Sequence, residues 1–109
     1  MRDRNDKIEG PFLIDENLIF RGIISGEGTV RRAVMLELTG MKLTGMITGD
    51  LDIEVGARAI IRGTVNGTIR NHGGYVEIFG SVGAVVDYSP EAQTIVDAQA
   101  LIGRQTSGH

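Results

Sequence analysis

Apolar and polar residues alternate over much of this chain. In the stretch Leu51-Asp-Ile53-Glu-Val55 every second side chain is apolar, and residues 34–43 and 57–61 follow the same period. A two-residue period indicates half-buried strands, because successive side chains of a strand point to opposite faces. A helix would need apolar positions about three to four residues apart, and frequent Gly, Thr and Val disfavour it further. The pattern therefore predicts short strands joined by tight turns.

A short motif occurs three times in the middle of the chain. It reads apolar, polar or large, Gly, any, apolar, any, small, at residues 43–49, 61–67 and 78–84. Its first glycine recurs at Gly45, Gly63 and Gly80, at spacings of 18 and 17 residues. A fixed period of this size is typical of a solenoid, in which neighbouring turns supply each other's core. We expect the glycines at corners that need a positive φ or a close backbone approach.

Shifting the chain by one period places apolar residues on apolar residues. Four apolar columns result: Ile24, Ile47, Val65 and Val82; Phe20, Leu43, Ile61 and Ile78; Met41, Ala59 and Val76; and Leu51, Ile69 and Val86. The columns between them hold mixed residues. Apolar inward columns and variable outward columns are what a β-helix requires, because each side chain packs on its equivalents in the neighbouring coils.

These observations predict an all-β fold, a short single-stranded β-helix (solenoid) of about three to five coils with about 17–18 residues per coil and irregular terminal coils. We expect a polar lead-in at 1–11, a β-helix domain at 12–103 with regular coils at 40–86, and a tail at 104–109. The motif glycine Gly22 precedes the next by 23 residues, so the first coil carries an insertion. We place this insertion at 27–32.

Residues 89–103 admit two interpretations. Ser89 as N-cap and Pro90 at the first helical position predict a short capping helix. Residues 96–102, however, match residues 55–61 in character at every position. We favour a last, partial coil over the capping helix.

Composition narrows the possible functions. Aromatic residues make up only 5% of the chain, so the core must be aliphatic, which suits the narrow interior of a coiled sheet. The net charge is −3 and no basic block occurs, so we expect no nucleic-acid partner. The absence of cysteine excludes disulfides and thiolate sites. No apolar run reaches the ~18 residues that a membrane span needs, and we expect a cytoplasmic protein.

The unit Ala-x-Ala-Ile-Ile-x-Gly-x-Val-x-Gly-x-Ile at 57–69 resembles the repeat of the bactofilins, bacterial cytoskeletal proteins that polymerise and have a β-helix core. The resemblance covers residues 40–86. It implies a structural protein that self-assembles without nucleotide through the open ends of the helix. We expect no cofactor. One departure is the number of regular coils, only about three here, fewer than such a core usually carries.

Asp50, Asp52 and Glu54 share one face of a predicted strand. Three carboxylates in this arrangement can bind Ca²⁺ or meet a basic partner, or can simply be solvated outward positions. Repeated acidic calcium motifs are missing, so we predict no metal site.

A second candidate contact surface contains Phe79, Tyr75 and Arg62. Alternation places the two aromatic side chains outward, near Arg62 and Arg70, and aromatic residues beside arginine are enriched at protein interfaces. A neighbouring loop that covers them is the alternative.

No catalytic motif is present, and we interpret His72, in the turn at 71–74, as a surface histidine. We therefore predict that the protein is not an enzyme and forms a homo-oligomer through its coil ends. The alternative is a heteromeric binding module, such as an immunity or antitoxin-type inhibitor of a partner protein. The residues expected to support the fold are Gly45, Gly63, Gly80, Ile47, Val65 and Val82.

Overall fold

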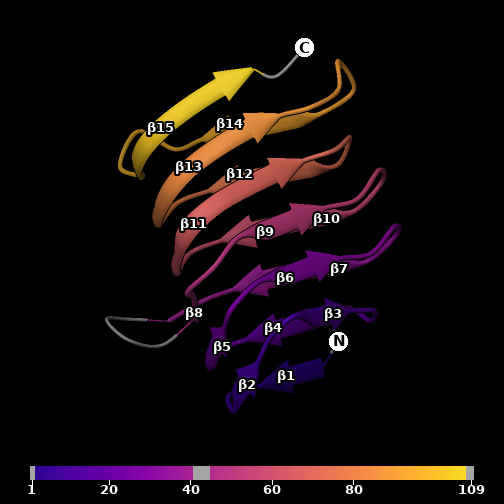
Figure 1. Cartoon of the computed structure of the whole chain (residues 1–109), viewed down its shortest axis with the longest axis vertical. Helices are drawn as coiled ribbons and strands as arrows, with labels where there is room; N and C mark the ends of the chain where they lie inside the picture. The colour runs from indigo at the N-terminus through magenta and orange to yellow at the C-terminus, as the bar shows by residue number, and fades with distance from the viewer. Residues whose placement is uncertain (1, 41–44, 108–109) are drawn as a thin grey trace.

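The computed structural model describes residues 2–40 and 45–107, which wind into a β-solenoid of stacked parallel strands (Figure 1). The described residues contain strands and no helix, so the predicted all-β solenoid is confirmed. The two termini lie at opposite ends of the stack. The molecule measures 35 × 27 × 21 Å along its principal axes.

One wall of the solenoid is a six-stranded parallel sheet. Successive turns each contribute one strand to it, and five parallel pairings connect the six strands, which gives about five turns. Its strands, in spatial order, are β1 (Arg2–Arg4), β4 (Leu18–Phe20), β7 (Met35–Leu38), β10 (Arg58–Ile61), β12 (Tyr75–Ile78) and β14 (Gln93–Val96).

The rest of each turn belongs to a second sheet, and its strands change in length along the stack. The three N-terminal turns use two short strands each: β2 (Lys7–Glu9), β3 (Phe12–Ile14), β5 (Ile23–Ser25), β6 (Gly28–Val30), β8 (Met46–Ile47) and β9 (Leu51–Ile53). The later turns use one longer strand each: β11 (Thr64–Asn71), β13 (Ser81–Asp87) and β15 (Leu101–Ser107). The long strand β11 pairs with both β8 and β9, so it replaces two short strands.

The central core column follows the predicted register. Ile24, Ile47, Val65 and Val82 are successive partners in the second sheet and are at most 4% exposed. Ile8 and Ile102 extend the column to the two ends of the stack. The column therefore passes through every turn of the solenoid.

Two predicted columns contain a wrong member. Leu38 pairs with Phe20 and Ile61 and therefore occupies the position predicted for Leu43. Leu36 occupies the position predicted for Met41. Both Leu36 and Leu38 are fully buried. Leu43 and Met41 lie outside the described residues.

The cause is the place of the insertion. Ile47 lies nine positions after Leu38, whereas Val65 lies four positions after Ile61 in the next turn, so the earlier turn has five extra residues between Leu38 and Ile47. The prediction at 27–32 was wrong, because residues 28–30 form β6 and pair with β9.

The fourth column is displaced by one residue in its last member. Val85, and not Val86, pairs with Ile69 and is buried. The pairing of β11 with β13 shifts register after Val65, where two residues of β11 face one of β13. This β-bulge shortens the later turn by one residue.

Residues expected to flank the solenoid belong to it. The expected lead-in, residues 1–11, supplies β1 and β2, which pair with β4 and β5. At the other end, β15 begins in the predicted domain and continues through residues 104–107 of the expected tail.

Residues 89–103 form most of a final coil instead of a capping helix. Ser89 Oγ accepts a hydrogen bond from Glu91 N at 3.1 Å, but the turn leads into strand β14. The internal register differs from the proposed match with residues 55–61. Val96 pairs with Ile78 and therefore continues the column of Ile61, which the match had assigned to Ile102.

The motif glycines lie at a corner where consecutive turns touch. Gly45 has a φ of 61°, a conformation that favours glycine. A Cβ on Gly63 would collide with the carbonyl oxygen of Gly45, and one on Gly80 would collide with that of Gly63. Glycine is thus required at this corner by backbone contact between turns.

We predict that Gly63→Ala lowers the free energy of unfolding by about 3 kcal/mol or more, because neither neighbouring backbone can retreat without breaking the sheet. Gly28→Ala is the matched control, since its Cβ would lie at an ordinary 3.5 Å from Leu51 Cδ1. The control should change stability by less than about 1 kcal/mol. Urea unfolding measures both, and equal losses would contradict the contact.

A second prediction tests the register. Val65→Asp should cost about 3–5 kcal/mol, because it buries an unpaired carboxylate in a fully buried position. Asn66→Asp, one residue further on an exposed position, should be nearly silent. Thermal and urea unfolding measure the stability of both variants. A similar loss of stability in both would refute the assignment of Val65 as inward and Asn66 as outward.

Candidate interaction surfaces

Two members of the predicted acidic row face an arginine. Asp52 Oδ1 lies 2.7 Å from Arg70 Nε, and Asp50 Oδ2 lies 3.4 Å from Arg70 Nη2. Glu27 approaches the same nitrogen at 3.6 Å. Hydrogen bonding to Asp52 raises the pKa of Arg70 above its usual value, so the guanidinium stays protonated over the ordinary pH range. Arg70 thus neutralises part of the acidic surface.

The acidic side chains also hold backbone groups. Asp50 Oδ1 accepts a hydrogen bond from Thr68 N at 2.8 Å, and Glu54 Oε1 accepts one from Arg32 N at 2.9 Å. Among the described residues, no group of three or more His, Asp or Glu side chains could hold a metal ion. The row joins adjacent turns of the solenoid and leaves less free negative charge for a basic partner than the sequence suggested.

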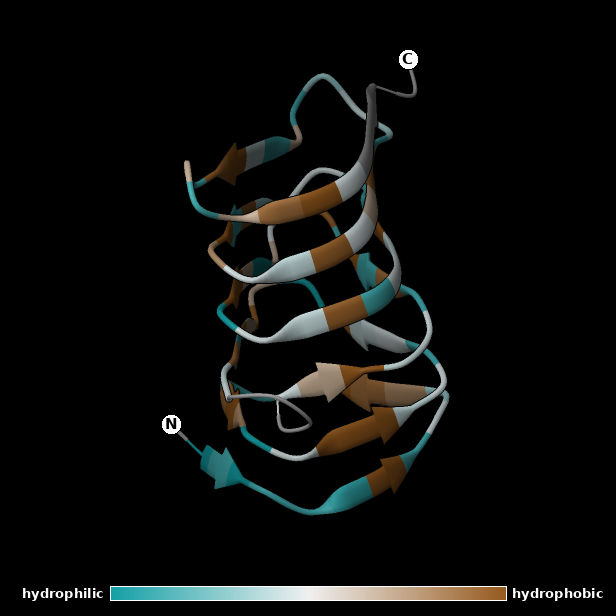
Figure 2. Ribbon diagram, turned by 90° about the vertical axis from the view of Figure 1, so that its left-hand side faces the viewer, coloured by the Kyte–Doolittle hydropathy of each residue, from teal (hydrophilic) through white to brown (hydrophobic). Residues whose placement is uncertain are grey.

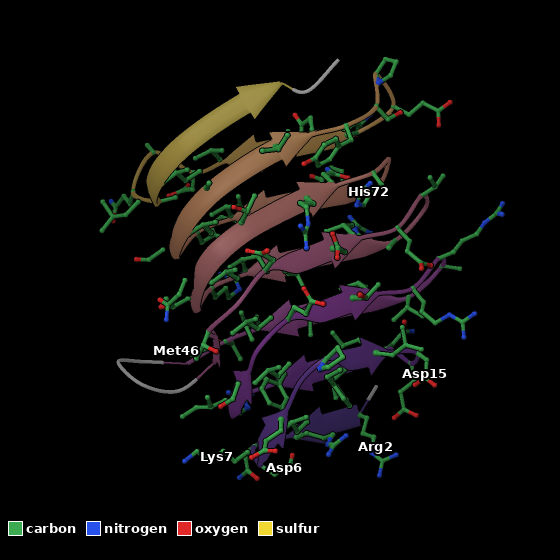
Figure 3. The ribbon with its side chains drawn as sticks, viewed as in Figure 1. Arg2, Asp6, Lys7, Asp15, Met46 and His72 are labelled. Carbon is green, nitrogen blue, oxygen red and sulfur yellow. The ribbon has the colours of Figure 1, made fainter. Side chains whose placement is uncertain are left out.

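His72 lies beside this cluster on the outer surface (Figure 3). Its Nε2 is 3.2 Å from Asp52 Oδ1, and its ring stacks on that of Tyr88 with centroids 5.1 Å apart and planes 11° apart. Sequence reasoning placed His72 in a turn but missed both neighbours. Asp52 precedes His72 by 20 residues, which is close to the length of one turn. The repeat period could therefore have predicted this contact.

Aromatic and arginine side chains pair between adjacent turns, in the first sheet and directly after its strands. The Arg62 guanidinium carbon lies 4.7 Å from the centroid of Phe79, as the sequence led us to expect. Tyr75 is paired in the same way with Arg58, at 5.0 Å. Partial desolvation, with a smaller contribution from Glu77, raises the pKa of Tyr75. Each pair is a cation–π contact between two adjacent turns.

The N-terminal end of the stack carries charge at positions that are apolar in the next four turns. Arg2 and Arg4 pair with Leu18 and Phe20, whose columns form the core. The Arg4 guanidinium lies 5.5 Å from the ring centroid of Phe12, on the opposite side of the coil. Arg4 therefore extends across the cross-section of the first turn.

Ion pairs hold this charged end together. Arg4 Nη2 lies 2.7 Å from Asp6 Oδ2, and this hydrogen bond lowers the pKa of Asp6 below its usual value. Arg2 Nη1 lies 3.2 Å from Glu16 Oε1. Arg2, Asp6 and Lys7 surround the N-terminal turn in Figure 3, and Figure 2 shows strand β1 in the teal of hydrophilic residues.

The C-terminal end carries a group of exposed apolar side chains. Leu101 is 70% exposed, Ile95 52% and Val96 36%, and all three belong to the last two strands. Val96 and Ile102 continue core columns, in register with Ile78 and Val82. Among the described strands, β14 pairs only with β12 and β15 only with β13. The outer edges of both strands are therefore open as far as the described residues show.

A buried polar network fixes this last turn. Asn71 is fully buried, and its Nδ2 donates to Gln93 O at 3.3 Å and to Thr94 Oγ1 at 3.2 Å. Thr94 Oγ1 donates in turn to Asp87 Oδ1 at 2.7 Å. Asn71 Oδ1 accepts from Gly74 N at 2.8 Å. The sequence marked Asn71 only as a turn residue, because a buried polar contact one turn away leaves no apolar signal.

Comparison with known proteins assigns no family to the chain: no protein-family model, curated protein or solved structure matches it. Within residues 2–40 and 45–107, no helix is long and apolar enough to cross a membrane. The interpretation of function therefore rests on the surfaces described above.

We predict that Arg70→Gln destabilises the fold by about 0.5–1 kcal/mol at low salt, because it leaves three carboxylates facing one another. The loss should shrink in high salt, which screens partly exposed charges. Arg31→Gln, at an exposed position, is the control and should have little effect. Urea unfolding at two salt concentrations measures both variants, and a salt-independent loss would argue against the electrostatic cause.

Proposed function

We propose that this protein is a structural, non-enzymatic solenoid that assembles with copies of itself through its C-terminal coil end. The observation that carries the proposal is the exposed apolar group on the last turn, Ile95, Val96 and Leu101, next to two open strand edges. The resemblance of residues 57–69 to the bactofilin repeat supports the same kind of role.

Two contributions to the free energy of binding favour a contact that covers this end. Open strand edges carry unpaired N–H and C=O groups, which pair readily with another chain. Apolar side chains gain roughly 25 cal/mol for each Å² removed from water. Val96 and Ile102 continue core columns, and Ile95 and Leu101 lie next to them in the outward columns of Glu77 and Ser81, so one contact can cover apolar side chains and open edges together.

The shape of the end favours another solenoid as the partner. The open edges of β14 and β15 lie on two different walls of the coil, in the first and second sheets. A single extended peptide can pair with only one of these edges. A second coil of the same cross-section offers two strands in the same arrangement, and a second copy of this chain is such a coil.

We predict that Leu101→Asp weakens self-association about tenfold or more, because a carboxylate at the joint would have to be desolvated. The mass of the protein is measured by light scattering across a concentration range. The wild type should rise above the mass of one chain as concentration increases.

Leu13→Asp is the matched control. Leu13 is another exposed leucine, 46% exposed, but it lies on β3 in the N-terminal turn. It should associate like the wild type. A wild type that stays monomeric at high concentration would refute the proposal, and equal weakening by both variants would show that the C-terminal end is not the joint.

A further inference from the structure

The two ends of the solenoid differ in what they offer to a continuing stack. At the C-terminal end, two core columns finish in Val96 and Ile102, whereas the columns of Val76 and Val85 finish in Thr94 and Gln105. The column that contains Val96 and Ile78 continues to Phe20 near the N-terminal end. It finishes there in Arg4, which pairs with Phe20. One end is thus apolar and the other is charged in the same column.

A head-to-tail stack would place these unlike residues in contact. If a second molecule continued the coil below β1, its Val96 would lie on Arg4 and its Thr94 on Arg2, by the register of the six-stranded sheet. The contact would take Arg4 and its partner Asp6 out of water. Burying charges in an apolar contact is costly, and inward-pointing charges are a known device against edge-to-edge growth.

We infer that the assembly closes at two copies joined at their C-terminal ends, and that Arg2 and Arg4 are the residues that stop further growth. This inference rests on the proposed function. A joint between two identical ends is isologous, so each copy uses the same patch and no equivalent patch is left for a third. The two charged N-terminal turns then form the outer ends of the dimer.

The wild-type mass tests closure without any substitution. Light scattering and sedimentation should give a plateau at twice the mass of one chain as concentration rises. Masses that continue to grow would overturn the inference and leave the proposed function standing. A constant single-chain mass would overturn the proposed function instead.

The double variant Arg2→Leu/Arg4→Ile tests the stop itself. It restores the apolar residue types found at Leu18 and Ile61 in the same columns, and it should assemble beyond two copies. Adding Leu101→Asp to it should return the mass to at most two chains, because only the opened N-terminal end can then pair.

Lys7→Leu/Glu9→Leu is the control for added hydrophobicity on the same turn. Lys7 and Glu9 are exposed and pair with Ile23 and Ser25 in outward columns, so this variant should remain a dimer. Circular dichroism and urea unfolding verify that each variant is folded. A folded Arg2→Leu/Arg4→Ile variant that stays at two chains, or growth of the control as well, would refute the role of the arginines.

Discussion

The stacking of each turn on the next is the interaction on which this structure depends. Every strand pairs in parallel with its equivalent one turn away, and the buried column from Ile24 to Val82 repeats the same apolar contact. Because a turn cannot bury its inward side chains alone, the stability of the stack is the sum of contacts between neighbouring turns. The outer features of the molecule follow this rule, since Arg70 and Arg62 also contact residues of an adjacent turn.

The glycine corner fixes the distance between turns. The carbonyl oxygens of Gly45 and Gly63 occupy the space that a side chain on the following motif glycine would need. The period in the sequence is therefore a consequence of backbone packing, which explains why it was readable without any contact information. The later turn is one residue shorter in the second sheet. The β-bulge between β11 and β13 accommodates this difference and leaves the corner unchanged.

The sequence predicted the features that repeat and missed those that do not. Alternation and period identified the strands and the central column, but residues 34–43 hold apolar residues at 36, 38, 41 and 43. Hydrophobicity alone does not decide which pair enters the core, so the insertion was misplaced. Asp50 and Asp52 were found by alternation, whereas Arg70 required a step of 18 residues along the stack. The charged turn at 1–11 was taken for a lead-in because its residues lack a core pattern, although its backbone pairs with β4 and β5.

The polar network of the last turn bears on how an open end can remain ordered. An uncovered coil loses half of the contacts that hold an inner one, and a frayed end would have to be ordered again on binding, which reduces affinity. Asn71 offsets that loss because it reaches Gln93 and Thr94 from the preceding turn, and Asp87 receives the hydroxyl of Thr94. These bonds are directional and lie inside the coil, so they hold β14 in register while Val96 and Leu101 stay exposed. Polar contacts with the preceding turn thus hold the C-terminal turn in place, and its exposed apolar side chains are free to contact a second molecule.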